Sequence, residues 1–229
     1  ITAKAWTAAL VAVLVLLGAA TFHRNALWSD PVAFPADMVK KSPNSTKALV
    51  ILGNAIRMHS PERTTEAIPL FKRALELEPD YFRAHYNLAK TYEQLGYIDK
   101  AIEHLEISRD VRAQNVDPYF SLAYIYEQQG NLAESRELLL EVLDMAPDYY
   151  KVHFSLGNVH LKMEDYTNAA AYYRKALELA PWHVDSLNNQ GYTYYLSGDT
   201  EEAIGVYRRA IEQAPGYPNH RVVPHLLCL

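Results

Sequence analysis

Prolines, glycines and aromatic residues recur along this chain at a constant interval of 34 residues. Pro147, Pro181 and Pro215 mark the interval most simply. The residues that match between these prolines are small or aromatic. They are Gly157, Ala169, Tyr173 and Ala176 in one copy and Gly191, Ala203, Tyr207 and Ala210 in the next. A period of this length is typical of a two-helix unit, and such units bury their apolar faces by stacking on one another.

This pattern resembles that of the tetratricopeptide repeat, a helix–turn–helix unit. The resemblance implies an all-α fold, namely a right-handed superhelix (an α-solenoid) of five repeats. We expect residues 25–45 to contain a short helix, beginning near Pro31, that packs on the first repeat. Residues 218–229 are expected to form an irregular or truncated tail, because Pro224 interrupts the pattern. The predicted array is 46–217, with repeats at 46–81, 82–115, 116–149, 150–183 and 184–217.

Glycine follows the predicted first helix in three of these repeats. Gly96, Gly130 and Gly198 occupy the same position of the repeat. A residue with positive φ commonly closes a helix, and glycine adopts that conformation without steric cost. We therefore predict a left-handed backbone at these three turns.

The stretch Ala5–Phe22 contains no charged residue. Its eighteen residues would span about 27 Å as a helix, close to the ~30 Å thickness of a bilayer core. We therefore predict a transmembrane helix within residues 1–24. A cleaved signal peptide and a buried helix of a soluble protein are the alternatives. The flanking Lys4 and Arg24 are too balanced to orient the helix.

The segment that follows carries a second resemblance. Arg24-Asn25-x-x-Trp28-x-Asp30 and then Ser42-Pro43-Asn44 resemble the junction between the last membrane helix and the repeat tail of polytopic protein O-mannosyltransferase-like glycosyltransferases. The similarity covers Thr21 to Ile56 and departs from the family at Pro35, where a bulky aromatic residue is expected. It implies a periplasmic or luminal array. The catalytic loops of that family lie upstream, so no catalytic residue is carried over.

Composition excludes several classes of function. Lys and Arg total 22 against 27 Asp and Glu, for a formal net charge of −5, which does not predict a nucleic-acid partner. Cys228 is the only cysteine, so neither an intramolecular disulfide nor a cysteine zinc site can form. His153 and His160 share a helix face, but at positions that pack inside a repeat. We find no phosphate loop and no catalytic set, and expect neither an enzyme nor a cofactor.

The resemblance implies that the first helices line a concave groove, whose accessible residues are the second, fifth, sixth, ninth and twelfth of each repeat. Aromatic and asparagine side chains are frequent there, which suits an extended peptide. The alternative is that these residues only pack neighbouring repeats. Asn54 and Asn87 match half of a carboxylate clamp, but Val50 replaces its lysine. The predicted binding residues are Asn54, Arg83, Tyr86, Asn87, Lys90, Phe120, Tyr124, Lys151, Phe154, Asn158, Asn188, Tyr192 and Tyr195, and Glu127, Leu161 and Asn189 occupy further such positions.

These observations predict a membrane-anchored scaffold that binds a protein or peptide in its groove and takes part in an envelope or larger membrane complex. Two other interpretations remain open. The chain could be the repeat tail of a polytopic glycosyltransferase whose catalytic part is absent, or a single-span assembly factor of the envelope.

Overall fold

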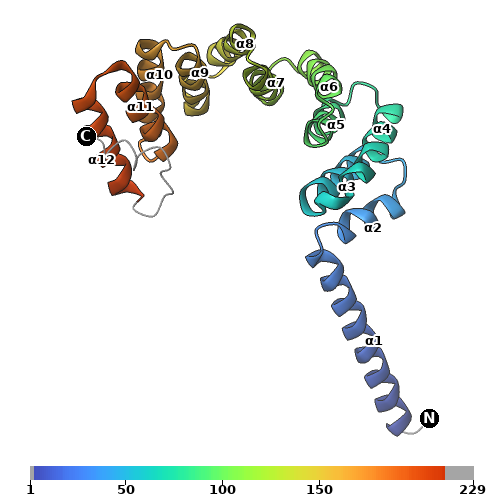
Figure 1. The fold of residues 1–229 in the computed structure, drawn as a ribbon. Helices are drawn as coiled ribbons and strands as arrows, with labels where there is room; N and C mark the ends of the chain where they lie inside the picture. Colours follow the sequence, from blue (N-terminus) through green and yellow to red (C-terminus); the bar gives the residue numbers. More distant parts are fainter. Residues whose placement is uncertain (1–2, 215–229) are drawn as a thin grey trace. The chain divides into compact units, whose positions relative to one another are not determined.

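The computed structural model describes residues 3–214, apart from the side chains of residues 3–5, 7–9, 20, 23–24 and 26–27. Within this range the chain forms twelve α-helices, one 3-10 helix and no strand (Figure 1). The predicted all-α, solenoid-like fold is confirmed. The chain divides into two compact units, Ile1–Arg112 and Ala113–Leu229. The predicted tail at 218–229 lies outside the described residues.

The first unit contains six α-helices and the 3-10 helix. In this unit α2 packs on α3, α3 packs against α4, and α5 packs against both α4 and α6. The elements are α1 (Ala3–Ser29), α2 (Ala33–Lys41), α3 (Thr46–His59), η1 (Pro61–Glu66), α4 (Ala67–Leu77), α5 (Phe82–Gln94) and α6 (Ile98–Val111).

The second unit is three helix pairs. The two helices of each pair pack against each other, and α8 packs on α9 as α10 does on α11. In both units the first helix of each pair begins at the first residue of a predicted repeat. The helices are α7 (Val116–Gln129), α8 (Leu132–Met145), α9 (Tyr150–Lys162), α10 (Tyr166–Leu179), α11 (Val184–Ser197) and α12 (Thr200–Gln213).

A close approach of two helices decides which residues each pair can hold. The place where a Cβ would stand on Gly157 of α9 is 2.5 Å from Cε1 of Tyr173 on α10, and the same contact at Gly191 with Tyr207 is 2.7 Å. Gly53 meets the Phe71 ring, again at 2.7 Å. A side chain at these glycines would overlap the ring. The aromatic core of these pairs therefore depends on glycine.

The other two repeats use a different pair of residues at the same positions. Ala89 and Ala123 replace the glycine, while Leu105 and Leu139 replace the aromatic ring. All four residues are buried. The alanine adds a methyl group to the first helix, and the leucine on the second helix is smaller than the aromatic ring that it replaces. The total volume between the two helices therefore stays similar.

The turn glycines have the predicted conformation. Gly96, Gly130 and Gly198 have φ values of 80°, 83° and 90°. The predicted helix start near Pro31 is two residues early, since α2 begins at Ala33. The N-cap residue is Val32, and Asp30 lies just before it, where its Oδ1 accepts hydrogen bonds from the backbone N–H groups of Val32 and Ala33 at 2.8 and 2.9 Å.

The predicted membrane span is not supported. Ala5–Phe22 lies within α1, yet none of the helices that the structure describes is both long and apolar enough to cross a bilayer. The prediction of a single span, and of a periplasmic or luminal array based on it, is therefore wrong.

Two histidines make the stability of the fold depend on pH. Burial, and then the neighbouring His85, lower the pKa of His104, and burial lowers that of His183. A depressed histidine pKa means that the unfolded chain binds more protons below about pH 6.5, so the stabilisation is complete above that pH and is lost as the pH falls. We expect the urea midpoint to drop between about pH 7.5 and 5, and to drop less in His104→Gln. Equal midpoints for the native chain at both pH values would contradict this.

Candidate functional site

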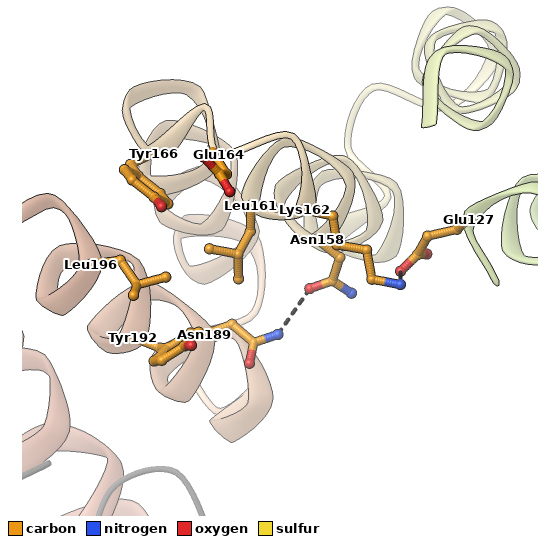
Figure 2. A pocket seen from close by; sticks show the side chains of 9 residues that line it. All are labelled: Glu127, Asn158, Leu161, Lys162, Glu164, Tyr166, Asn189, Tyr192 and Leu196. Atoms are coloured by element: carbon orange, nitrogen blue, oxygen red, sulfur yellow. Dashed lines mark hydrogen bonds and ion pairs between the residues drawn. The ribbon is translucent and has the colours of Figure 1, made fainter. Parts of the chain in front are cut away.

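The second unit contains a cavity of about 590 Å³ that opens across three first helices. Figure 2 shows its lining side chains, which come from α7, α9, the turn after α9, the first residue of α10, and α11. The lining combines one ion pair, two amides, two tyrosines, two leucines and one further carboxylate. These residues are Glu127, Asn158, Leu161, Lys162, Glu164, Tyr166, Asn189, Tyr192 and Leu196.

Two asparagine side chains are bound to each other at one wall of the cavity. Oδ1 of Asn158 accepts a hydrogen bond from the Nδ2 group of Asn189 at 2.9 Å (Figure 2). It accepts a second from the Tyr173 hydroxyl at 2.7 Å. These two bonds fill both lone pairs of the oxygen. Among the described residues, Nδ2 of Asn158 and Oδ1 of Asn189 have no protein partner. The pair therefore offers one donor group and one acceptor to a ligand.

The position of Asn158 is fixed from inside the helix pair. Tyr173 is fully buried, and its ring lies against the backbone of Gly157. This contact brings the Tyr173 hydroxyl within hydrogen-bonding distance of Asn158, the residue next to the glycine. A glycine on α9 and a tyrosine on α10 thus orient an amide at the cavity wall.

An ion pair joins α7 to α9 beside Asn158 (Figure 2). Nζ of Lys162 lies 2.7 Å from Oε1 of Glu127, whose side chain is only 13% exposed. A partly shielded pair of this kind is less weakened by salt than a fully exposed one. Because the Glu127 and Lys162 charges neutralise each other, neither is available to pair with a ligand.

Glu164 closes the turn after α9 in an unusual backbone conformation. Its φ of 60° is the only positive value at a non-glycine residue in the described part of the chain. By the repeat register, Glu164 stands where three other repeats have Gly96, Gly130 and Gly198. A side chain in this conformation costs about 1 kcal/mol. The turn therefore places a carboxylate at the cavity, although a glycine at this position would be less strained.

Only two of the thirteen residues predicted to bind a partner, Asn158 and Tyr192, line this cavity. In the first unit, Asn54 and Asn87 occupy the equivalent positions of their repeats, but each amide binds its own helix. Oδ1 of Asn54 accepts from Nη2 of Arg57 at 2.7 Å, and Nδ2 of Asn87 donates to the backbone oxygen of Arg83 at 2.8 Å. Within the described residues, the Asn54 and Asn87 side chains are not hydrogen-bonded to each other as those of Asn158 and Asn189 are. Tyr86 and Lys90 lie half-buried on α5.

The remaining predicted residues of the second unit have mixed surroundings. Tyr124 is 54% exposed, and Lys151 is exposed beside the Tyr149 ring. Asn188 is a correction, because its side chain is buried, with only 7% exposed. The three other residues are half-buried, and they are Phe120, Phe154 and Tyr195.

Four lining residues were absent from every set of predicted groove positions: Lys162, Glu164, Tyr166 and Leu196. Lys162 and Leu196 are the thirteenth residues of their repeats, one beyond the last predicted groove position. Glu164 lies in the turn after α9, and Tyr166 is the first residue of α10. A signal for Glu164 was present in the sequence, since it breaks the series of turn glycines.

The histidines are used for packing. His153 and His160 are buried as predicted, and their ring nitrogens lie 2.8 Å from the Pro147 backbone oxygen and 2.9 Å from Oδ2 of Asp165. No group of three His, Cys, Asp or Glu residues in the described chain could hold a metal ion.

Comparison with protein families and curated proteins identifies the repeat. Three family models described as tetratricopeptide repeat match residues 59–110, 115–181 and 154–218. The human protein O-mannosyl-transferase TMTC3 is 27% identical over 94 residues, 41% of this chain and 10% of that protein. The peroxisomal targeting signal receptor of Candida glabrata is 37% identical over 67 residues, 29% of this chain and 11% of that protein. The aligned part is about a tenth of either relative.

Solved structures share the fold. MamA has a TM-score of 0.65 at 20% identity, with 77% of this chain and 95% of MamA covered. YrrB, described as a tetratricopeptide-repeat protein with an unusual peptide-binding site, has a TM-score of 0.66 at 18% identity, covering 85% of this chain and 98% of YrrB. The Cut9-Hcn1 hetero-tetramer of the APC/C has a TM-score of 0.69 at 19% identity, covering 85% of this chain and 39% of the matched chain.

Proposed function

Because the chain is built of tetratricopeptide repeats, we propose that it is an interaction scaffold whose second unit binds an extended peptide segment of a partner protein. The observation that carries the proposal is the amide pair of α9 and α11. It leaves the Nδ2 group of Asn158 and the Oδ1 atom of Asn189 available at the cavity. An extended backbone presents a C=O and an N–H, the matching acceptor and donor.

Hydrogen bonds to the backbone supply affinity without selecting a sequence, and the surrounding side chains supply the contact area. Tyr192 stands beside the amides, and Tyr124 is exposed on α7 of the same unit. Tyrosine buries a large area at a small cost in conformational entropy, which suits a binding surface. Three similar proteins support a binding role: YrrB has an unusual peptide-binding site, the Candida glabrata protein is a targeting-signal receptor, and Cut9 is part of a hetero-tetramer.

The proposal predicts the effect of removing the amides. In a titration followed by NMR, the probe acetyl-Ala-Ala-norleucine-Ala-Ala-amide is expected to shift the side-chain amide resonances of Asn158 and Asn189. Asn189→Ala should weaken the binding of this peptide roughly tenfold, the effect of losing one hydrogen bond and leaving its backbone partner unpaired. Asn158→Ala should weaken it at least as much.

Asn87→Ala is the matched control, since Asn87 has the same position in its repeat as Asn189 but binds its own helix. It should leave the affinity unchanged. An equal loss in Asn87→Ala and Asn189→Ala, or no loss in either, would contradict the proposal.

A second candidate function rests on the match to TMTC3. In this alternative the repeats are part of a larger O-mannosyltransferase-like enzyme and hold its protein acceptors or partners. The intact mass of the native polypeptide separates the two. A mass far above the 26.0 kDa of this sequence favours the enzyme, and a mass near that value rules it out.

A further inference from the structure

One half of the cavity has the shape and chemistry of a pocket for a long side chain. Figure 2 shows Glu164 and Tyr166 together on one side, with Leu161 and Leu196 between them and Tyr192. The leucines and tyrosine rings form an apolar wall, and the Glu164 carboxylate lies at its edge. A side chain that is apolar along its length and positively charged at its end would match the apolar wall and the carboxylate at its edge.

Among the charged side chains at and beside the cavity, Glu164 is the one whose charge is not balanced by a described neighbour. Glu127 is neutralised by Lys162 at 2.7 Å. Asp165, the next residue, accepts hydrogen bonds from His160 at 2.9 Å and from the Asn168 side chain at 2.7 Å. Glu164 has no ion pair within the described residues and is exposed. The cavity therefore holds one negative charge without a partner.

The backbone of Glu164 gives an independent indication that the carboxylate is functional. Three other turns at this position use glycine at positive φ, and only this turn, which borders the cavity, holds a side chain in that strained conformation. Local strain of this kind concentrates at binding and catalytic sites. A glycine at this position would relieve the strain, but it would also remove the carboxylate.

We infer that the cavity selects a peptide segment carrying a lysine or arginine, whose aliphatic stem packs on Leu161 and Leu196 and whose cation pairs with the Glu164 carboxylate. This inference rests on the proposed peptide-binding function and names the side chain that the same site prefers. The rings of Tyr166 and Tyr192 add faces on which the cation and its stem can pack. Glu164 is thereby the residue that determines specificity, while Asn158 and Asn189 hold the backbone.

The test uses three probes, acetyl-Ala-Ala-X-Ala-Ala-amide with X as lysine, norleucine or glutamate. Norleucine has the apolar stem without the charge. We expect the lysine peptide to bind about fivefold more tightly than the norleucine peptide, the size of a partly exposed ion pair, and the glutamate peptide to bind most weakly. In Glu164→Gln the lysine and norleucine peptides should bind equally.

A second variant separates selectivity from folding. Glu164→Gly relieves the positive-φ strain, so its melting temperature should equal or exceed that of the native chain while its preference for lysine is lost. A preference for lysine that survives in both variants would overturn the inference.

The outcomes distinguish this inference from the proposed function. Equal binding of all three peptides, still dependent on Asn189, would overturn the selectivity and leave backbone binding in place. No shift with any peptide would remove both proposals. A concentration-dependent dimer in sedimentation that Glu164→Gln abolishes would assign the pocket to a second copy of the chain and would also overturn the inference.

Discussion

Gly157→Ala is expected to destabilise the protein by about 2 kcal/mol, although alanine is the better helix former by about 1 kcal/mol. The added methyl group would stand 2.5, 2.7 and 2.9 Å from three ring atoms of Tyr173. Tyr173 is fully buried and cannot move aside without disturbing its neighbours. Overpacking of this kind costs about 1–3 kcal/mol and here exceeds the gain in helix propensity. Urea unfolding followed by circular dichroism measures the difference.

Gly205→Ala is the matched control. Gly205 lies in the middle of α12, is exposed, and has no atom near the place of an added Cβ. The same substitution should therefore stabilise the chain by about 0.5–1 kcal/mol. Two substitutions of identical chemistry then have opposite signs. A Gly157→Ala protein as stable as the native one would show that the two helices separate easily.

The double variant Gly157→Ala/Tyr173→Leu is expected to recover part of the stability that the two single substitutions would remove together. Tyr173→Leu alone removes much of a buried ring and should cost about 2–4 kcal/mol. Together the two substitutions produce the alanine and leucine combination that Ala89 with Leu105 holds in the second repeat. We expect the double variant to be about 1–3 kcal/mol more stable than the sum of the single effects predicts.

A double-mutant cycle in urea measures this coupling. Strict additivity of the two single effects would contradict the matched-volume explanation. The recovered protein should nevertheless bind the norleucine peptide poorly. It lacks the Tyr173 hydroxyl that holds Asn158, so the loss of binding cannot be attributed to unfolding.

The repeat architecture could be predicted from the sequence because its determinants are local and periodic. The spacing of Gly157, Tyr173 and Pro181 repeats often enough to set the register, and the turn glycines mark where first helices end. Burial of His153 and His160 followed from the same register. The membrane span was predicted from the absence of charge in Ala5–Phe22, which is a statement about composition alone, and none of the described helices is long and apolar enough to cross a bilayer.

The site was predictable only as a set of helix positions. Asn158 and Tyr192 were among them, but the bonds that orient Asn158 depend on side-chain torsions in three helices. Asn188 lies one residue from Asn189 and is buried, because a step of one residue rotates the side chain by about 100° around the helix. Glu164 was missed because turn residues were considered only as helix ends.

The amides of the two units show how such an array can diversify. Asn54 and Asn158 occupy one repeat position, yet Asn54 is bound by Arg57 on its own helix and Asn158 by Tyr173 from the next. The residue that corresponds to Tyr173 in the first repeat is Phe71. These two buried rings differ by a single oxygen atom. A repeat can therefore gain or lose a recognition element on its outside through an interior substitution that leaves its outer surface unaltered in sequence.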